Sequence, residues 1–322
     1  MRCNRRVWLS LAGAAFLTAA SLPAGAQVRN LELIAPAAPG GGWDQTARAM
    51  QTAIQEAGIA SGVQVVNIPG AGGTIGLAQF VASKRPSDPS LLVSGLIMVG
   101  AIQTNQSPVS LDEVTPLARL IGEYEMIAVT KDSPIQSMQD LVEQLRADPG
   151  GVSWGGGSAG GTDHMLVGLI AKAAGVDPRE INYIAHSGGG EAMGSILGGH
   201  VTVGANGLAE LLPQVESGAL RPLAVSSEER LPGLDVPTLK ETGLDVALTN
   251  WRGVMAPADI DDDDKQALGD VIARMVESPA WQSTLEKQGW IDMYQPADAF
   301  ATFLEEDEAQ TETVLRDIGL VE

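Results

Sequence analysis

Three consecutive glycines, Gly40, Gly41 and Gly42, form the stretch of this chain best suited to binding a ligand. They follow a short apolar run, residues 31–35, that suits a buried strand, and they precede apolar residues at helical spacing from Ala47 onward. The first turn of a helix has free backbone N–H groups, and glycine lets a ligand approach them closely. The loop therefore predicts either an anion site or a tight turn without a ligand.

A second glycine-rich segment, residues 155–160, matches two patterns of enzyme chemistry. It has the G-x-G-x-x-G spacing of dinucleotide-binding loops, but the candidate acid, Asp177, precedes the next strand instead of ending it. The same residues fit G-x-S-x-G, which would make Ser158 a nucleophile with Asp177 and either His186 or His200. Both histidines fall at predicted turns, so a serine hydrolase remains only the remote alternative.

Other reactive side chains give no sign of catalysis or metal binding. The three histidines lack metal-ligand spacing, and the single cysteine, Cys3, lies in the N-terminal segment. Asp44 and Arg48 are four residues apart, which predicts a helix-surface ion pair or a helix cap. The acidic run 261–264 suits a helix N-terminus. We therefore expect no catalytic residues, no metal and no cofactor.

The first 26 residues read as a cleaved signal peptide. A basic start is followed by an apolar run, residues 7–20, and by a small-residue cleavage site at 24–26. The apolar run is shorter than the ~20 residues a membrane span needs. Arg5 and Arg6 leave both the general and the twin-arginine export routes open. We expect a periplasmic protein without a lipid anchor, because Cys3 is far from the cleavage site.

The charge of the chain limits its partners. The formal net charge is −20 over 322 residues. A nucleic-acid partner is excluded, since phosphate binding requires a basic face. A small anionic ligand would have to be held by local donors against this overall field.

Strands and helices alternate along the chain, which predicts parallel strands with crossover helices. We expect strands at 31–35, 63–68, 90–98, 126–130, 151–154, 181–185, 201–205, 220–226 and 247–255. The expected helices include 74–83, 137–147, 259–288 and 296–318. Glycine loops follow strands in both halves, so the fold class is α/β with two lobes facing each other across a cleft. The lobes would comprise residues 27–129 with 249–322, and residues 130–248, with crossings near 128–131 and 248–252.

The order of several motifs resembles a known family. These are P-G-G-G-W-D at 39–44, N-I-P-G-A-G-G at 67–73, the loop 155–164, H-S-G-G-G at 186–190 and W-R-G at 251–253. Together they are similar to the periplasmic solute receptors of tripartite tricarboxylate transporters, the TctC or Bug family. The resemblance implies a type II periplasmic-binding-protein fold with two Rossmann-like lobes. It implies a monomer that captures a small carboxylate, performs no chemistry and delivers the ligand to large and small membrane subunits.

The resemblance also implies a set of ligand-binding residues, mostly backbone amides and hydroxyls of the glycine loops. In this sequence they are Gly40, Gly41, Gly42, Trp43, Ala71, Gly72, Gly73, Ser94, Gly95, Ser158, Gly160, Thr162, Asp163, Ser187, Gly188 and Asn206. The P-G-G-G-W form of the first loop points to the tricarboxylate branch of the family, so the expected ligand is citrate or a related di- or tricarboxylate. Trp43 either contacts the ligand or wedges the loop. A leucine at Gly42 is expected to block the site and leave the fold intact.

A receptor of this kind could serve a different output. The alternative is an orphan receptor that senses a carboxylate and signals to a sensor kinase. Genes for two membrane subunits beside this one would indicate transport, and a two-component pair would indicate sensing.

Overall fold

The computed structural model describes residues 28–322. The predicted signal peptide lies outside these residues. Within them, the structure contains no helix with the length and apolar character required to cross a membrane.

The first half of the molecule is built on parallel strands. β1 (Glu32–Ala35) pairs in parallel with β2 (Gln64–Asn67) on one side and β3 (Ser90–Gly95) on the other. β9 (Thr249–Ala256) then pairs antiparallel with β3. The helices of this half are α1 (Gly42–Glu56), α2 (Thr74–Ser83), α3 (Leu96–Thr104), α8 (Asp262–Val276), α9 (Pro279–Gln288) and α10 (Ala297–Asp317).

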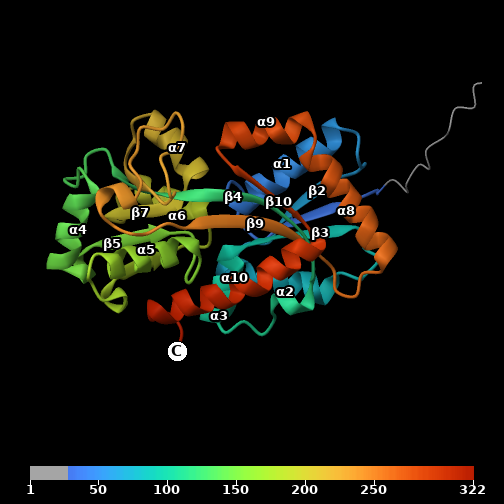
Figure 1. The fold of residues 1–322 in the computed structure, drawn as a ribbon, viewed down its shortest axis with the longest axis horizontal. Coiled ribbons are helices and arrows are strands. Elements are labelled where there is room, and N and C mark those ends of the chain that lie inside the picture. The colour runs from blue at the N-terminus through green and yellow to red at the C-terminus, as the bar shows by residue number, and fades with distance from the viewer. Residues whose placement is uncertain (1–27) are drawn as a thin grey trace, which may run out of the picture.

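One long strand, β4 (Thr115–Thr130), connects the two halves (Figure 1). Its residues 115–124 pair with β9, and residues 118–122 also pair with β10 (Ile291–Pro296). From Glu125 onward it pairs with β7 (Val203–Gly207) and β8 (Leu220–Val225). The partners of β4 therefore change between Tyr124 and Glu125.

The second half repeats the parallel arrangement. β5 (Ser153–Gly156) lies between β7 and β6 (Asn182–Ala185), parallel to both. The helices of this half are α4 (Met138–Ala147), α5 (Thr162–Ala173), α6 (Gly189–Leu197) and α7 (Leu208–Glu216). Figure 1 shows the two halves side by side, with β4 and β9 running between them.

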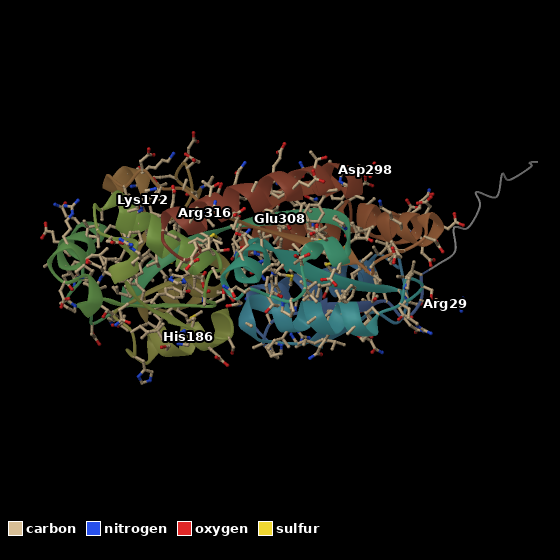
Figure 2. All side chains as sticks on the ribbon, turned by 90° about the horizontal axis from the view of Figure 1, so that it is seen from below. Arg29, Lys172, His186, Asp298, Glu308 and Arg316 are labelled. Carbon is tan, nitrogen blue, oxygen red and sulfur yellow. The ribbon has the colours of Figure 1, made fainter. Side chains whose placement is uncertain are left out.

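The cores are aliphatic and largely separate. The first-half core includes Leu33, Ile54 and Leu91, and the second-half core includes Ile127 and Val167. The end of α10 crosses to the second half, where Lys172 on α5 pairs with Asp317 at 2.9 Å. Figure 2 shows Lys172 and Arg316 on the same side of the molecule, near this crossing. The halves are thus joined by two strands and one helix end.

The mixed α/β architecture is as predicted, but four elements differ from the sequence expectation. The strand expected at 90–98 ends at Gly95, and α3 starts at once. The strand expected at 126–130 begins at Thr115. The single helix expected over 259–288 is two, because Pro279 starts α9 and the Ser278 side chain accepts a hydrogen bond from the Trp281 N–H. β10 was not predicted; its residues are half-buried or exposed and do not alternate regularly.

The lobe limits, 27–129 with 249–322 and 130–248, stay a prediction. The change of strand partners at Tyr124 and Glu125 comes earlier than the crossing expected near 128–131.

Phe300→Ala should destabilise the protein, because it leaves a cavity where α10 packs on β9. The Phe300 ring is fully buried and meets Trp251 edge-on at 5.6 Å. We expect a loss of about 3–5 kcal/mol in the free energy of unfolding, measured by urea denaturation. Phe303→Ala is the matched control: Phe303 is half-buried and also meets Trp251, at 5.4 Å, so its loss should be smaller. Equal losses would show that α10 is not anchored through Phe300.

Candidate functional site

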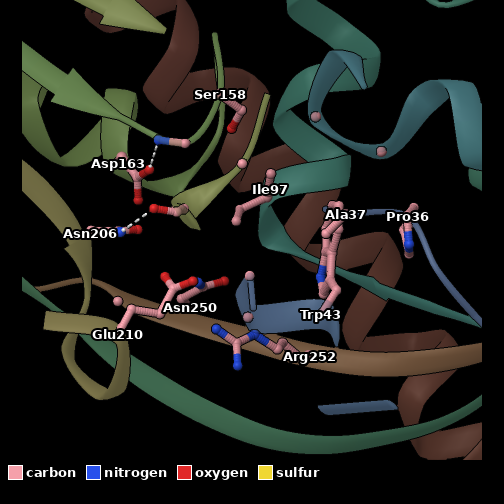
Figure 3. A pocket seen from close by; sticks show the side chains of 18 of the residues that line it. Pro36, Ala37, Trp43, Ile97, Ser158, Asp163, Asn206, Glu210, Asn250 and Arg252 are labelled. Atoms are coloured by element: carbon pink, nitrogen blue, oxygen red, sulfur yellow. Dashed lines mark hydrogen bonds between the residues drawn. The ribbon is translucent and has the colours of Figure 1, made fainter. Parts of the chain in front are cut away.

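A pocket lies between the two halves, where β4 and β9 cross (Figure 3). Around it the halves almost touch: a Cβ added at Gly41 would lie 4.0 Å from the Gly189 nitrogen, and one at Gly72 would lie 3.6 Å from the Ser158 Cβ. The structure therefore shows the cleft closed. The pocket is lined by Pro36, Ala37, Gly41, Gly42, Trp43, Gly72, Gly73, Ile97, Glu125, Gly157, Ser158, Asp163, Ser187, Gly188, Gly189, Asn206, Gly207, Glu210, Asn250 and Arg252.

Four helices begin at or near this pocket without a side-chain cap. The N-cap residues of α1, α5, α6 and α7 are Gly41, Gly161, Gly188 and Gly207. Because a glycine cap offers no acceptor, the first N–H groups of these helices need another partner. The Ala209 N–H of α7 is already bonded to Glu123, and the N–H groups that stay free, together with the helix dipoles, favour an anion. Two halves of the molecule thus direct helix N-termini at one space.

The first glycine loop is held in shape by Asp44. Its carboxylate accepts hydrogen bonds from the Gly40 N–H, the Asn67 amide and Arg48, each at 2.9 Å. Burial opposes its charge, but these three bonds outweigh burial and lower the pKa of Asp44. The predicted ion pair with Arg48 is confirmed. Asp44 therefore supports the loop from behind.

The second glycine loop is held by an aromatic pair. The Tyr183 hydroxyl donates to the Ser158 carbonyl at 3.0 Å, and its ring stacks on His164 at 4.0 Å. The Gly160 N–H donates to His164 Nδ1 at 3.1 Å, and burial lowers the pKa of His164 to about 4. A neutral His164 is what this acceptor role requires.

Ser158 itself is buried, and its hydroxyl has no hydrogen-bond partner within residues 28–322. His186 Nδ1 lies 3.1 Å from the Gly156 carbonyl, and Asp177 pairs with Arg179. A serine nucleophile needs a base within hydrogen-bond reach. The arrangement instead leaves a free hydroxyl on the pocket wall.

A buried ion pair forms the floor of the pocket. Arg252 on β9 and Glu123 on β4 are 2% and 1% exposed, and they are directly paired. Glu123 also accepts the Ala209 N–H at 2.9 Å, while Arg252 Nε has no partner. A side chain at Gly42 would collide with the Arg252 guanidinium. Position 42 must therefore be a glycine to leave room for Arg252 as well as for any ligand.

Three further carboxyl groups face the pocket. Burial raises the pKa of Glu125 well above its usual range, with the neighbouring Asp163 adding to the effect. Burial also raises the pKa of Asp163 to about 6, although the hydrogen bond that the Gly157 N–H donates to its carboxylate acts to lower this pKa. The pKa of Glu210 is raised to about 8 by burial and by Glu123, with Arg252 acting in the opposite direction. Figure 3 shows Asp163 and Glu210 on the left of the pocket and Arg252 below it.

Most of the residues proposed from the sequence line this one pocket. They are Gly41, Gly42, Trp43, Gly72, Gly73, Ser158, Asp163, Ser187, Gly188 and Asn206.

Six others do not line it and support the wall instead. Gly40 and Gly160 use their N–H groups within the loops, and the Ala71 carbonyl accepts from Thr74. The buried Ser94 hydroxyl faces Met98 Sδ at 3.7 Å, and Gly95 packs against the Trp251 carbonyl. Thr162 starts α5 and is fully buried.

Sequence reasoning missed the charged floor. Arg252 was noted only as part of a motif, and Glu125, Glu210 and Asn250 were not considered. A signal was present: Glu123 and Glu125 are two residues apart in an apolar strand, so both point to the same face. Buried charges normally need partners, so Arg252 within another apolar strand was the natural partner to look for.

Despite these carboxyls, residues 28–322 hold no group of three or more histidine, cysteine or acidic residues arranged to bind a metal.

The fold and site define a two-lobed solute-binding protein. Residues 46–320 match the family model described as the tripartite tricarboxylate transporter family receptor, and the chain belongs to this family. The resemblance seen in the motifs is confirmed. Relatives include the UPF0065 protein in the gbd 5' region of Cupriavidus necator, 29% identical over 98% of both chains. Protein BugT of Bordetella pertussis is 28% identical over 97% of this chain and 95% of its own.

Solved structures confirm the predicted periplasmic-binding-protein fold. The periplasmic binding protein BugD superposes with a TM-score of 0.83 at 23% identity, over 91% of this chain and 98% of its own. MatC from Rhodopseudomonas palustris with bound malate superposes with a TM-score of 0.79 at 20% identity, over 89% of this chain and 99% of its own. An R. palustris protein with adipate superposes with a TM-score of 0.81 at 24% identity, over 90% of this chain and 97% of its own.

Gly42→Ala should destabilise the protein, in contrast to the expectation that a leucine at this position would block the site and leave the fold intact. Its Cβ would displace Arg252 from the buried Glu123, which leaves an unpaired charge and should cost about 3 kcal/mol. Gly41→Ala is the matched control, because its Cβ would meet nothing closer than the Ala38 carbonyl oxygen at 3.3 Å and its φ of −74° suits alanine. Urea denaturation of both variants checks this; equal stability would show that Arg252 can relax away from Gly42.

Glu210→Gln should change how stability depends on pH. The folded pKa of Glu210 is raised to about 8, so the folded state holds this proton where the unfolded state has lost it. Below its unfolded pKa of about 4.3, Glu210 therefore makes its full contribution to the free energy of unfolding. This contribution decreases as pH rises to about 8, by about 1.4 kcal/mol per pH unit at most. Glutamine carries no such penalty. The variant should match wild type at pH 4 and exceed it at pH 8 in denaturant unfolding; parallel curves would contradict the assignment.

Proposed function

We propose that this protein is a periplasmic receptor that captures a small carboxylate by closing its two halves around it. The observation that carries the proposal is the convergence of three glycine-capped helix N-termini, those of α1, α6 and α7, from both halves on one closed pocket. Backbone N–H groups at helix N-termini donate hydrogen bonds to negatively charged groups, and this suits a carboxylate ligand.

The available donors are sufficient for such a ligand. Hydrogen bonds to a charged group contribute ~1.5–3 kcal/mol each. About four to six of them exceed the ~8 kcal/mol of a micromolar complex before the cost of ordering is subtracted. The buried Trp43 Nε1, Ser158 Oγ and Arg252 Nε lack partners and add donors to the backbone set. We propose that Trp43 contacts the ligand through its indole N–H.

The proposed ligand is a di- or tricarboxylate, with citrate as the leading candidate. MatC carries malate and the R. palustris neighbour carries adipate, so two related folds accept dicarboxylates. We propose that the receptor is exported by its N-terminal segment, acts as a monomer and delivers the ligand to the large and small membrane subunits of a tripartite transporter.

Calorimetry against citrate, malate, succinate and adipate tests the proposal, using protein refolded from denaturant to remove bound ligand. We expect micromolar or tighter binding of at least one of them. Gly188→Val should weaken it more than tenfold, because position 188 caps α6 and lines the pocket, and a Cβ there would lie 3.9 Å from the Ala38 nitrogen across the cleft. Gly269→Ala on α8, a glycine remote from the pocket with nothing around it, is the control. Binding of sugars or amines with no carboxylate bound would refute the proposal.

The proposed role includes no chemistry on the ligand. A fluorophosphonate probe checks this directly, because a base-activated serine reacts with it stoichiometrically. Ser158 should remain unlabelled, and full labelling of Ser158 would point to a hydrolase.

A further inference from the structure

The pocket has too few cations for the anion that it is proposed to bind. Its lining contains the carboxyl groups of Glu125, Asp163 and Glu210 and a single guanidinium, Arg252, which is already paired with Glu123. Within residues 28–322 no lysine or histidine lines it. Ionised carboxylates beside a bound carboxylate would repel it, and the net charge of the chain adds to this repulsion.

Unpartnered polar atoms show where the ligand must bind. Glu210 Oε1 is buried without a hydrogen-bond partner, and Glu125 Oε2 receives no N–H from the residues described, its carboxyl neighbour being Asp163. The Ser158 hydroxyl, 2% exposed, and the Trp43 indole, 5% exposed, are equally unpartnered and line the same pocket from the two halves. Buried polar groups are normally satisfied, so this concentration of free ones indicates a site completed by a ligand.

We propose that Glu125 and Glu210 bind the ligand as neutral acids, each donating its O–H to a ligand carboxylate, so that ligand and protons are captured together. The inference rests on the proposed carboxylate receptor. An O–H···O⁻ hydrogen bond is among the strongest available to a protein. The proton comes from solvent, remains on the glutamate and is shared with the ligand oxygen; no covalent bond to the ligand is made or broken.

The surroundings of both glutamates support this protonation state. Glu125 faces Asp163, Glu123 and Glu210, and its Oε1 accepts the Asn250 amide at 3.0 Å. Asp163 is close enough to share a proton with it. No cation among the residues described contacts Glu125 directly.

Glu210 has a different set of neighbours. It faces Glu123 and Asp163, and its cationic neighbour Arg252 is neutralised by Glu123. The Gly42 N–H is directed at it from the other half of the molecule. Tyr183, whose pKa burial raises, is a further neutral hydroxyl beside Asp163. Burial raises the pKa of both glutamates, so the protonated forms are within reach near neutral pH.

The test measures proton uptake on ligand binding. Malate and adipate are suitable probes, because their carboxyls ionise well below pH 7 and any uptake near pH 8 belongs to the protein. Calorimetry in buffers of different ionisation enthalpy should show uptake at pH 8.5. Affinity should weaken once pH rises above the pKa values that the two glutamates have in the open, ligand-free protein, by up to about tenfold per pH unit for each proton.

Glutamine substitution separates protonation from structure. Glu210→Gln keeps a hydrogen-bond donor in the place of the acid O–H, so its affinity for malate or adipate at pH 7 should lie within about threefold of wild type. The variant should lose most of the pH dependence of affinity near pH 8. Glu125→Gln should lower proton uptake as well. Asp307→Asn is the matched control: burial raises the pKa of Asp307 to about 6, but it does not line the pocket, so the variant should show wild-type uptake.

Three outcomes would overturn the inference. Dicarboxylate binding without proton uptake, or with identical pH profiles in wild type and Glu210→Gln, refutes it and leaves the carboxylate receptor standing. Preference for aspartate over malate, lost in Glu210→Gln, would mean that the glutamates are ionised and bind an ammonium. No carboxylate binding at any pH removes both proposals.

Discussion

The buried ion pair between Glu123 and Arg252 is the constraint on which the rest of the site depends. It joins β4 to β9 at the point where the partners of β4 change from one half to the other. Such a pair is expensive to bury and damaging to break, so its surroundings are fixed around it. Gly42 must lack a side chain because the guanidinium occupies that space, and the Ala209 N–H at the start of α7 is held by Glu123. One ion pair therefore sets the positions of helix starts in both halves.

The electrostatics of the pocket follow from this arrangement. At an effective dielectric of about 20, two like charges ~5 Å apart repel by about 3 kcal/mol. Ionised Glu125 and Glu210 would thus cancel much of what helix N–H groups contribute to binding an anion. Neutral carboxyl groups instead favour binding of the anion, since each donates an O–H hydrogen bond to it. The acid-rich floor is compatible with a carboxylate ligand only if protons are part of the bound state.

Local patterns in the sequence were enough for the architecture and for the glycine loops. Gly41, Gly42 and Gly188 stand between a strand and a helix, and that position alone places their N–H groups at the carboxyl ends of strands. The floor was not accessible in this way. Arg252 and Glu123 are far apart in the chain, and their pairing depends on the register between β9 and β4, which includes bulges that apolar patterning does not encode. Element ends were misjudged where a strand and a helix follow each other within one apolar run, as after Ser94 and Gly95, where β3 ends and α3 begins at once.

Closure and protonation are physically connected in this molecule. Glu210 belongs to the second half, yet its carboxyl meets the Gly42 N–H of the first, so this environment exists in full only when the halves are together. Opening the cleft would hydrate Glu210 and remove the burial that keeps it neutral. A proton on Glu210 therefore favours the closed state, and loss of that proton favours the open one. The same group that completes the ligand site thus also links its occupancy to the movement of the two halves.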